Sequence, residues 1–360
     1  MTGSVVLVGA GHAHLEVIRR APTLRSAGIE LTVVAPRWFR YSGLASPVAA
    51  GLLPPSANTI DVAALARRCG VAHHEATVDA IDLPGRRLRS DDGAWHPYTA
   101  VSFNVGSVSR TDQLTVAPEV LVTKPLVRLA ALALRLADLA PHSHPPRIAV
   151  VGAGATGVEL AATIGVRLGR RAEVVLYGRG SRLLEGLPGR AGRLAARALA
   201  VRGVELALGM PVTAVGPDEV QVAGTRRQVD AVVLATGLVA PPVLTRLGIG
   251  DARGVPTSAT LQHPDHPEVF AVGDGAHFLP RPLPALGVYG VRAAPVLIAG
   301  LRAFHTGQPQ PIFRPQRRSL QVLELGDGEA LAVRHPLVWR GRTALALKRR
   351  IDHRWLDRYR

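Results

Sequence analysis

The stretch RIAVVGAGATGVEL, residues 147–160, decides the fold. An apolar run of strand type leads into Gly152-x-Gly154-x-x-Gly157, and apolar residues then recur at helical spacing. In such a strand, turn and helix, the first glycine allows the turn, the second lets a pyrophosphate approach the backbone, and the third lets helix and strand pack closely. The stretch therefore predicts a dinucleotide-binding unit whose helix N-terminus faces the phosphates.

Length and composition favour a layered α/β protein with more than one domain. The chain has 360 residues, 47% of them hydrophobic, and 37 glycines, which is enough for two or three domains with buried parallel strands. Cys69 is the only cysteine, so no disulfide framework, multi-cysteine metal site or redox dithiol is expected. The N-terminus shows no secretion signal and no stretch is expected to span a bilayer, which predicts a cytoplasmic protein.

The formal charge of +16 comes almost entirely from arginine, because Lys124 and Lys348 are the only lysines. The basic residues are spread along the chain without a nucleic-acid recognition motif, so no nucleic-acid partner is expected. A basic surface with affinity for an anionic cofactor or an anionic membrane fits the pattern better.

A second copy of the glycine turn stands at the N-terminus. Residues 5–8 form an apolar strand run that opens into Gly9-Ala-Gly11-His12-Ala-His14, where a histidine replaces the third glycine. Neighbours two apart do not share a helix face, so His12 and His14 are not expected to form a metal site. His12 close to a bound pyrophosphate remains an alternative to a purely structural role.

The end of the second strand, Ile29–Val34, is unusual. Ala35 stands where dinucleotide-binding folds carry an acidic residue for the ribose, and Arg37 is a candidate replacement. The following residues 38–55, with Tyr41-Ser42-Gly43-Leu44 at their centre, are either a binding loop or an ordinary connection.

The chain repeats its own plan. Residues 71–81 form a strand, a hairpin around the Asp91-Asp92-Gly93 turn follows, and an apolar run closes at Gly106. After the second glycine turn, residues 203–215, another hairpin and a run closing at Gly237 repeat this order. The duplication predicts two doubly wound, Rossmann-like sheets, each with a small β-meander.

A third informative stretch is HPEVFAVGDG, residues 266–275. An apolar strand ending in Gly273-Asp274 places a carboxylate at the carboxyl edge of the sheet, where open α/β sheets bind ligands. There Asp274 can accept hydrogen bonds from a ribose or polyol. The alternative is an aspartate that only caps the next turn.

These motifs in this order resemble the pyridine-nucleotide-disulfide oxidoreductase superfamily of flavoproteins. His12-Ala13-His14, Tyr41-Ser42-Gly43, Lys124-Pro125 and the tail at residues 348–352 are similar to type II NADH dehydrogenase-like proteins, including those fused to selenophosphate synthetase. The resemblance covers essentially the whole chain.

The resemblance implies an α/β fold in which an NAD(P)H-binding domain, residues 112–240, is inserted between two segments of an FAD-binding domain, residues 1–111 and 241–312. Residues 313–360 would form C-terminal strands and a helix. It also implies catalytic residues Glu159 and Lys124, where nicotinamide meets flavin. The cofactor-binding residues expected on this basis are Gly9, Gly11, His12, Arg37, Gly106, Gly152, Gly154, Gly157, Arg179, Gly237, Gly273 and Asp274.

Two departures from the resembled proteins narrow the activity. The paired cysteines of disulfide reductases and sulfide:quinone reductases are absent, so neither activity is expected. The glutamine that type II NADH dehydrogenases carry near the quinone is also absent, and VRAAP, residues 291–295, occupies the region. We expect an FAD-dependent NAD(P)H oxidoreductase with a quinone-like or other small acceptor. The alternatives are a reductase of an electron-carrier protein such as ferredoxin, and a slow nucleotide-sensing flavoprotein.

The strand over residues 173–177 bears on nucleotide choice. It ends at Gly178, without an acidic residue that would hold a ribose 2'-hydroxyl and repel a 2'-phosphate. Arg179 and Arg182 follow, and guanidinium groups suit bidentate phosphate contacts. The pattern predicts that NADPH is tolerated.

The C-terminus predicts one helix from Thr343 onward, with Leu347, Ile351, Trp355 and Tyr359 recurring every four residues beside a basic flank. This pattern suits a helix lying on a membrane surface, which would place the protein at the inner face of the cell membrane. The alternative is that the apolar stripe packs onto the FAD domain.

Overall fold

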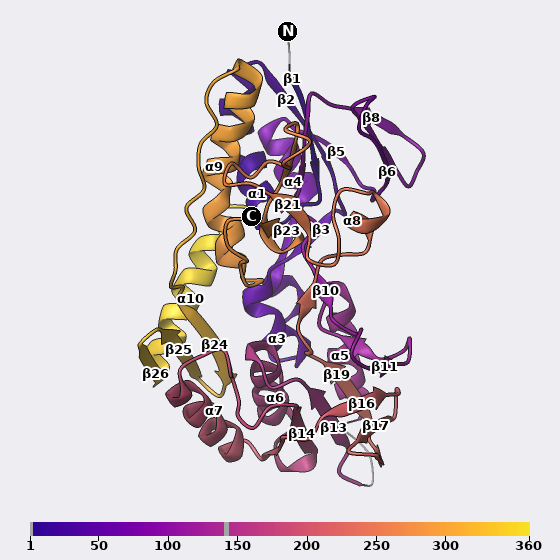
Figure 1. Cartoon of the computed structure of the whole chain (residues 1–360). Helices are drawn as coiled ribbons and strands as arrows, with labels where there is room; N and C mark the ends of the chain where they lie inside the picture. The colour runs from indigo at the N-terminus through magenta and orange to yellow at the C-terminus, as the bar shows by residue number, and fades with distance from the viewer. Residues whose placement is uncertain (1–2, 140–143) are drawn as a thin grey trace.

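The computed structural model describes residues 3–139 and 144–360. Two lobes lie one above the other along the long axis of the molecule, and each is built around a five-stranded parallel sheet (Figure 1). This architecture confirms the predicted α/β fold with two dinucleotide-binding domains.

The upper lobe holds the sheet with the order β22-β9-β1-β2-β5. Its strands alternate strictly, because Val5 and Leu7 of β1 face one core while Val6 and Val8 face the other. The helices α1, α4 and α9 cover the first face, and a three-stranded meander covers the second. The bounds are β1 (Gly3–Val8), β2 (Ile29–Val34), β5 (Ala72–His74), β9 (Ala100–Phe103), β22 (Val269–Ala271), α1 (His12–Arg19), α4 (Val62–Cys69) and α9 (Gly287–Thr306).

The lower lobe repeats the plan with the order β12-β19-β13-β14-β15. Ile148 and Val150 of β13 face the helices α5, α6 and α7, whereas Ala149 and Val151 face a second meander. The bounds are β12 (Leu121–Val122), β13 (Arg147–Val151), β14 (Glu173–Gly178), β15 (Val204–Leu208), β19 (Ala231–Leu234), α5 (Leu126–Asp138), α6 (Ala155–Leu168) and α7 (Gly189–Val201). The meander consists of β11 (Thr115–Val116), β16 (Val212–Val215), β17 (Glu219–Val222) and β18 (Thr225–Gln228).

Two short strands carry the first crossing from the upper lobe to the lower lobe and the return. The strand β10 (Val108–Ser109) leads from the upper lobe to the lower lobe, and β20 (Leu238–Val239) leads back. The two strands pair antiparallel with each other. The upper sheet is then completed by β22, so the lower lobe is inserted within the upper one. The proposed divisions at 111/112 and 240/241 fall just after these two strands.

Two expected strands are each two strands in the structure. Residues 71–81 divide into β5, which completes the upper sheet, and β6 (Val78–Asp82), which begins the meander. Residues 203–215 divide at Gly209, whose φ of +69° breaks the strand between β15 and β16. Neither run contains a proline-glycine or asparagine-glycine pair that would mark the change of sheet.

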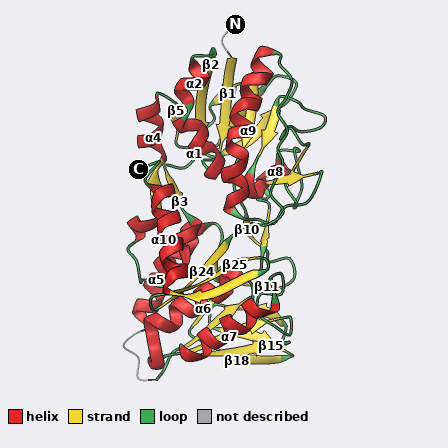
Figure 2. Ribbon diagram, turned by 90° about the vertical axis from the view of Figure 1, so that its left-hand side faces the viewer, coloured by secondary structure: helices red, strands yellow, loops and turns green. Residues whose placement is uncertain are grey.

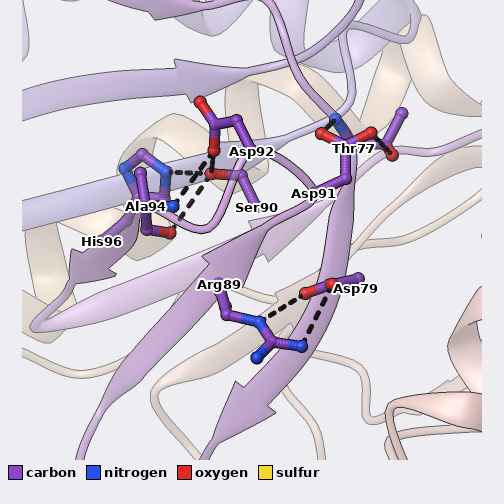
Figure 3. A network of polar contacts seen from close by, with 8 residues as sticks. All are labelled: Thr77, Asp79, Arg89, Ser90, Asp91, Asp92, Ala94 and His96. Atoms are coloured by element: carbon purple, nitrogen blue, oxygen red, sulfur yellow. Dashed lines mark hydrogen bonds and ion pairs between the residues drawn. The ribbon is translucent and has the colours of Figure 1, made fainter.

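The expected hairpin turn at Asp91-Asp92-Gly93 is confirmed between β7 (Arg87–Ser90) and β8 (Trp95–Pro97). Figure 3 shows the buried Ser90 hydroxyl 2.9 Å from His96 Nε2 and 2.5 Å from Asp92 Oδ1. Asp91 accepts a hydrogen bond of 2.7 Å from the Thr77 hydroxyl. The Ser90 bonds hold the turn together, and the Asp91 bond fastens it to Thr77, the residue before β6.

The C-terminal segment forms a small sheet and a helix. The sheet consists of β24 (Gln321–Gly326), β25 (Glu329–Arg334) and β26 (Leu337–Gly341), and α10 (Arg342–Leu356) follows. β24 packs against α6 of the lower lobe, while Trp355 and Tyr359 lie in the core of the upper lobe. In Figure 2 α10 runs beside the junction of the two lobes.

The predicted helix is confirmed as α10, but it ends at Leu356, so Tyr359 of the predicted stripe lies beyond the helix. Residues four apart advance about 40° around a helix at each step, so a series of such steps leaves one face. Trp355 and Tyr359 are buried inside the protein, whereas Ile351 is 43% exposed. The residues of the predicted stripe therefore do not share one face. Packing onto the upper lobe, the alternative set out above, is what the structure has.

The helix α9 corrects another expectation. It is long and apolar enough, by length and composition, to cross a membrane. Its buried residues Ala294, Leu297 and Leu301 belong to the upper core, and it packs along α1. It therefore has the character of a core helix.

The remaining elements are short. They are α2 (Ala21–Arg25), α3 (Ala45–Ala49), α8 (Val243–Arg246), the pair β3 (Trp38–Arg40) and β4 (Thr59–Asp61), the pair β21 (Val255–Thr257) and β23 (Ala276–Phe278), and the 3-10 turns η1 (Ser42–Leu44), η2 (Pro55–Asn58), η3 (Gly169–Arg171) and η4 (Gly273–Gly275).

Candidate active site

A cavity of about 690 Å³ lies where the two lobes and the C-terminal segment meet. Its wall from the upper lobe includes Gly11, His12 and Asp274, and its wall from the lower lobe includes Thr156 and Glu159 at the start of α6. Other sequence-predicted residues in the lining are Gly106, Lys124 and Gly273. Segments far apart in sequence are thus brought to one cavity.

The mid-chain glycine turn has the geometry that its motif predicts. A Cβ atom at Gly157 would lie 1.7 Å from the carbonyl oxygen of Gly152, so only glycine lets α6 start this close to β13. A Cβ at Gly154 would meet nothing within 4 Å. Open space at the second glycine is where a pyrophosphate must approach, so the turn fits a dinucleotide.

Asn104, which the sequence analysis included in an apolar run, organises the N-terminal turn. Its Oδ1 accepts hydrogen bonds from the backbone N–H groups of Ala13 at 3.0 Å and His14 at 3.3 Å, and its Nδ2 donates to the Val272 carbonyl at 2.8 Å. The amide thereby joins the start of α1 to the ends of β9 and β22. A polar residue directly after a buried strand was the available sign of this role.

The two histidines of the N-terminal turn have separate surroundings, as expected. His14 is fully buried, with Nδ1 2.6 Å from the Gly9 carbonyl and Nε2 2.8 Å from the Ser102 hydroxyl. Burial lowers the pKa of His14 to about 4, so the ring is neutral at pH 7. His12 lines the cavity and lies against Phe39, with ring centroids 5.2 Å apart.

Trp355 closes the same aromatic wall. Its ring stacks on Tyr41 with centroids 4.6 Å apart and lies 4.9 Å from His12. Its Nε1 donor is buried without a hydrogen-bond partner and belongs to a side chain that lines the cavity. An orphaned buried donor at this wall suits a bound group that offers an acceptor.

Asp274 and Lys124 lie together at the junction. The Ser107 hydroxyl donates to Asp274 Oδ2 at 2.8 Å, and the carboxylate separates the main cavity from a second cavity of about 520 Å³. Burial lowers the pKa of Lys124, and the negative charge of Asp274 opposes this shift. A carboxylate at this edge can accept hydrogen bonds from a polyol such as the ribitol of FAD.

Glu159 faces the cavity from α6. Burial raises the pKa of its carboxyl group to about 7, and the charge of Lys348 opposes the shift. Glu159 Oε1 accepts a 2.7 Å hydrogen bond from the backbone N–H of Glu324 in β24. The carboxyl group can therefore hold or release a proton near neutral pH.

Lys348 anchors α10 to this site. Its ammonium group is 2.7 Å from Asp352 Oδ2 and 3.9 Å from Glu324 Oε2, and it donates to the Gly43 carbonyl. Tyr41 donates to Asp352 Oδ1 at 2.8 Å. The sequence analysis named Tyr41 in a possible binding loop, and Tyr41 does line the cavity. It used Lys348 and Asp352 only as marks of resemblance, because their contact with Tyr41 depends on the position of α10.

Two predicted cofactor-binding arginines are absent from the lining of the cavity. Arg37 pairs with Asp61 at 2.9 Å, and Arg179 donates to Gln113 Oε1 at 2.9 Å beyond the end of β14. Gly9, Gly152, Gly154, Gly157 and Gly237 also lie outside that lining. Roles for these residues toward the remote ends of the dinucleotides stay predictions.

Two glycine turns at one cavity, with a carboxylate at a strand edge between them, define a protein of the class that binds two dinucleotides. The pyridine nucleotide-disulphide oxidoreductase family matches residues 3–294, and the chain belongs to this family. Membership confirms the oxidoreductase class and the expected cofactors FAD and NAD(P)H. The orphaned donor of Trp355, the space at Gly154 and the carboxylate of Asp274 fit such groups.

Curated relatives match over part of their length. Demethylphylloquinone reductase NdbB of Synechocystis sp. is 33% identical over 136 residues, which are 36% of this chain and 34% of that protein. The NADH dehydrogenase-like protein Rv1812c of Mycobacterium tuberculosis is 31% identical over 226 residues, which are 58% of this chain and 56% of that protein. The chain thus matches between a third and a little over half the length of these relatives.

Solved structures share the fold over the whole chain. NDH2 from Plasmodium falciparum in complex with NADH superimposes with a TM-score of 0.88 at 12% identity, covering 100% of this chain and 96% of that one. The sulfide:quinone oxidoreductase of Aquifex aeolicus gives 0.82 at 14% identity, covering 100% and 92%. At these identities the likeness concerns the fold.

Proposed function

We propose that this protein passes a hydride from NAD(P)H to bound FAD and two electrons onward to a small quinone-like acceptor. The observation that carries the proposal is the single cavity lined by both lobes and by the C-terminal segment. Gly11 and Asp274 stand on the FAD side, and Ala155, Thr156 and Glu159 stand on the nicotinamide side. The quinone reductase among the relatives supports a quinone as the acceptor.

Bound FAD supplies the chemistry by accepting two electrons as a hydride and giving them up again. The residues of the chain would position the two nucleotides, exclude water from between them and move protons. Asp274 would hold the polyol chain of FAD, and Lys124, which lines the same cavity, would bring a positive charge to the bound flavin. Reduction of a quinone to a quinol takes two electrons and two protons, and Glu159, with its pKa of about 7, can supply one proton and recover it from solvent.

We also propose that the reaction takes place on the cytoplasmic side of the membrane, with the exposed side of α10 as a peripheral contact. The basic, outward-facing side of α10, with Arg349, Arg350 and Arg354, supports this placement. A reductase of an electron-carrier protein such as ferredoxin is the second candidate, favoured by exposed arginines at the cavity.

Anaerobic titration of the purified protein with NADH and NADPH tests the proposal. We expect a yellow protein whose flavin absorption bleaches rapidly with a nicotinamide nucleotide and returns when a quinone is added. Recovery only with a reducible carrier protein would support the second candidate. A protein that neither carries FAD nor can be reconstituted with it would refute both.

A further inference from the structure

Three arginines surround the main cavity on the side of the C-terminal segment. Arg292 comes from α9, Arg318 from the segment before β24, and Arg334 from the end of β25. All three side chains line the cavity and are exposed. Within residues 3–139 and 144–360, none of them makes a side-chain hydrogen bond or an ion pair.

The carboxylates of the cavity are already engaged elsewhere. Asp274 accepts a hydrogen bond from Ser107, and Asp352 is bound by Tyr41 and Lys348. Glu159 accepts from the backbone of β24, and burial keeps much of it protonated near pH 7. The positive charge of the three arginines is therefore not compensated by the protein around it.

The phosphates of the two dinucleotides have other places to bind. The glycine turns and helix N-termini of α1 and α6 serve them. Arg40 also lines the cavity, but it follows Phe39, whose ring contacts His12 directly after the first turn. Arg40 therefore comes from a strand beside the first turn, whereas the three arginines come from α9, the segment before β24 and β25, which carry no glycine turn and are free to serve another ligand.

The lining that holds the three arginines also contains apolar side chains, with the polar Gln316 and Gln321 beside them. The apolar side chains are those of Val291, Leu320, Val322 and Ile351. An apolar surface bordered by guanidinium groups matches a flat ring that bears an acidic group, because arginine binds carboxylates and sulfonates through a planar fork of donors. Arg292 stands within the stretch 291–295, where the expected quinone-side glutamine is missing.

We propose that the acceptor taken up by this protein is a small aromatic compound carrying an acidic group, held by Arg292, Arg318 and Arg334. The inference deepens the proposed function and rests on it for the identity of the ligand as an acceptor. It distinguishes this cavity from one built for a neutral quinone ring alone.

Binding to the oxidised holoenzyme tests the inference without turnover. Isothermal titration compares 2-naphthalenesulfonate with 2-naphthalenemethanol, which share the ring and differ in charge. We expect the sulfonate to bind at least tenfold more tightly, and each Arg→Gln substitution at the three positions to weaken it roughly fivefold while leaving the alcohol unchanged. Arg302→Gln, on the exposed side of the same helix and outside the cavity lining, is the matched control.

Turnover adds a second measurement. Stopped-flow oxidation of the reduced holoenzyme compares 1,4-naphthoquinone-2-sulfonate with 2-methyl-1,4-naphthoquinone. The substitutions should lower the second-order rate constant for the sulfonate several-fold, spare the methyl compound, and leave the preceding reduction by NAD(P)H unchanged. The preference should shrink as salt rises from 20 to 500 mM, roughly as ionic screening predicts.

The outcomes separate the two proposals. Preferential sulfonate binding that depends on the arginines, with no quinone reduced, would remove the quinone function and retain an acid-binding site. Equal binding of both naphthalenes, or a loss with Arg302→Gln as large as with the other three, would overturn the inference. It would also be overturned if the substitutions slowed reduction by NAD(P)H. The same holds if they left sulfonate binding unchanged and weakened only the binding of a carrier protein or of anionic vesicles.

Discussion

The two glycine turns share one backbone plan and differ at the seam between strand and helix. In the lower lobe Gly157 leaves no room for a side chain beside Gly152, and the neighbouring strand supplies Ala235. In the upper lobe the matching place is taken by His14, whose ring bonds to the Gly9 carbonyl. One turn is closed by contact, and the other by hydrogen bonds between buried polar groups.

The difference extends two residues further along each helix. Glu16 of α1 and Glu159 of α6 stand at equivalent distances from their turns. Burial raises the pKa of Glu16, but hydrogen bonds from Arg19, Tyr359 and Arg20 outweigh it and hold the pKa below its usual value. Burial of Glu159 is opposed mainly by Lys348 and prevails. The same position is therefore structural in one lobe and able to titrate in the other.

The largest expected effect is that of Gly157→Ala. Its Cβ would lie 1.7 Å from a backbone oxygen, so α6 must move. This movement should lower the free energy of unfolding by about 3 kcal/mol or more. We expect loss of reduction by NAD(P)H and a fall in thermal stability, measured by stopped flow and calorimetry. Gly154→Ala has open space around its Cβ and is the control, which should fold normally but bind the nucleotide weakly. Equal stability of the two variants would show that contact at Gly157 does not close the lower turn. The asymmetry between the two turns would then disappear.

His14→Ala should damage the upper lobe. The substitution leaves the Gly9 carbonyl and the Ser102 hydroxyl without their buried partner, at a cost of about 2–3 kcal/mol. Chemical denaturation should show this loss, together with weaker FAD retention. Retained stability and FAD content would mean that the seam does not depend on its hydrogen bonds.

The same histidine predicts a pH dependence. Its folded pKa of about 4 lies below the ordinary value of 6.5, so the unfolded state binds the proton first and stability falls as pH falls through this interval. Between pH 7 and pH 5 this one group should remove about 2 kcal/mol of stability. His14→Ala should have a correspondingly flatter stability profile over that range.

Glu159→Gln should slow reoxidation of the reduced flavin by a quinone about tenfold while FAD stays bound, because Glu159 is the proposed proton donor to the quinone. The rate in the native protein should vary with an apparent pKa near 7, where this carboxyl group titrates, and the variation should vanish in the variant. Glu16→Gln is the matched control in the other lobe, and it should leave the rate and its pH profile unchanged. An unaltered profile in Glu159→Gln would assign the carboxylate to structure alone.

Much of this fold could be predicted because the motifs that mark its turns and strand ends are local in sequence. The glycine turns, the Asp91 hairpin and the strand ending in Asp274 each occupy a few consecutive residues, and their order implied the inserted lower lobe. The Lys348–Asp352–Tyr41 contacts could not be predicted, since they depend on where α10 docks across the junction. Asn104 was overlooked because a strand pattern registers apolar neighbours and not the one amide at its end.

Nucleotide choice is a smaller effect, and it compares the ends of β2 and β14. Neither end carries an acidic residue, and each is followed by an arginine. Arg37 is held by Asp61, whereas Arg179 is held only by the neutral Gln113 and is easier to release. We expect NADPH to be used, and Arg179→Ala to raise its KM roughly fivefold with little effect on NADH. Arg37→Ala should affect neither nucleotide, and a strong NADH preference unchanged by Arg179→Ala would contradict the assignment.

The smallest expected effect concerns the membrane, because α10 gives most of its apolar side chains to the interior. Trp355 and Tyr359 are in the upper core, so Ile351 and the exposed basic residues remain for contact with a surface. Each basic group near an anionic leaflet contributes about 1 kcal/mol, which suffices only for weak, salt-sensitive binding. We expect flotation with vesicles rich in anionic lipid at low salt, and its loss in the triple variant Arg349→Gln, Arg350→Gln, Arg354→Gln.

Truncation before Thr343 is the wrong test, since it would remove Lys348 and Trp355 from the cavity. A triple substitution of Arg86, Arg87 and Arg89 to glutamine, on the meander of the upper lobe, matches the change in charge. If the two triple variants float equally well, or if the native protein ignores anionic vesicles, α10 has no role at a membrane.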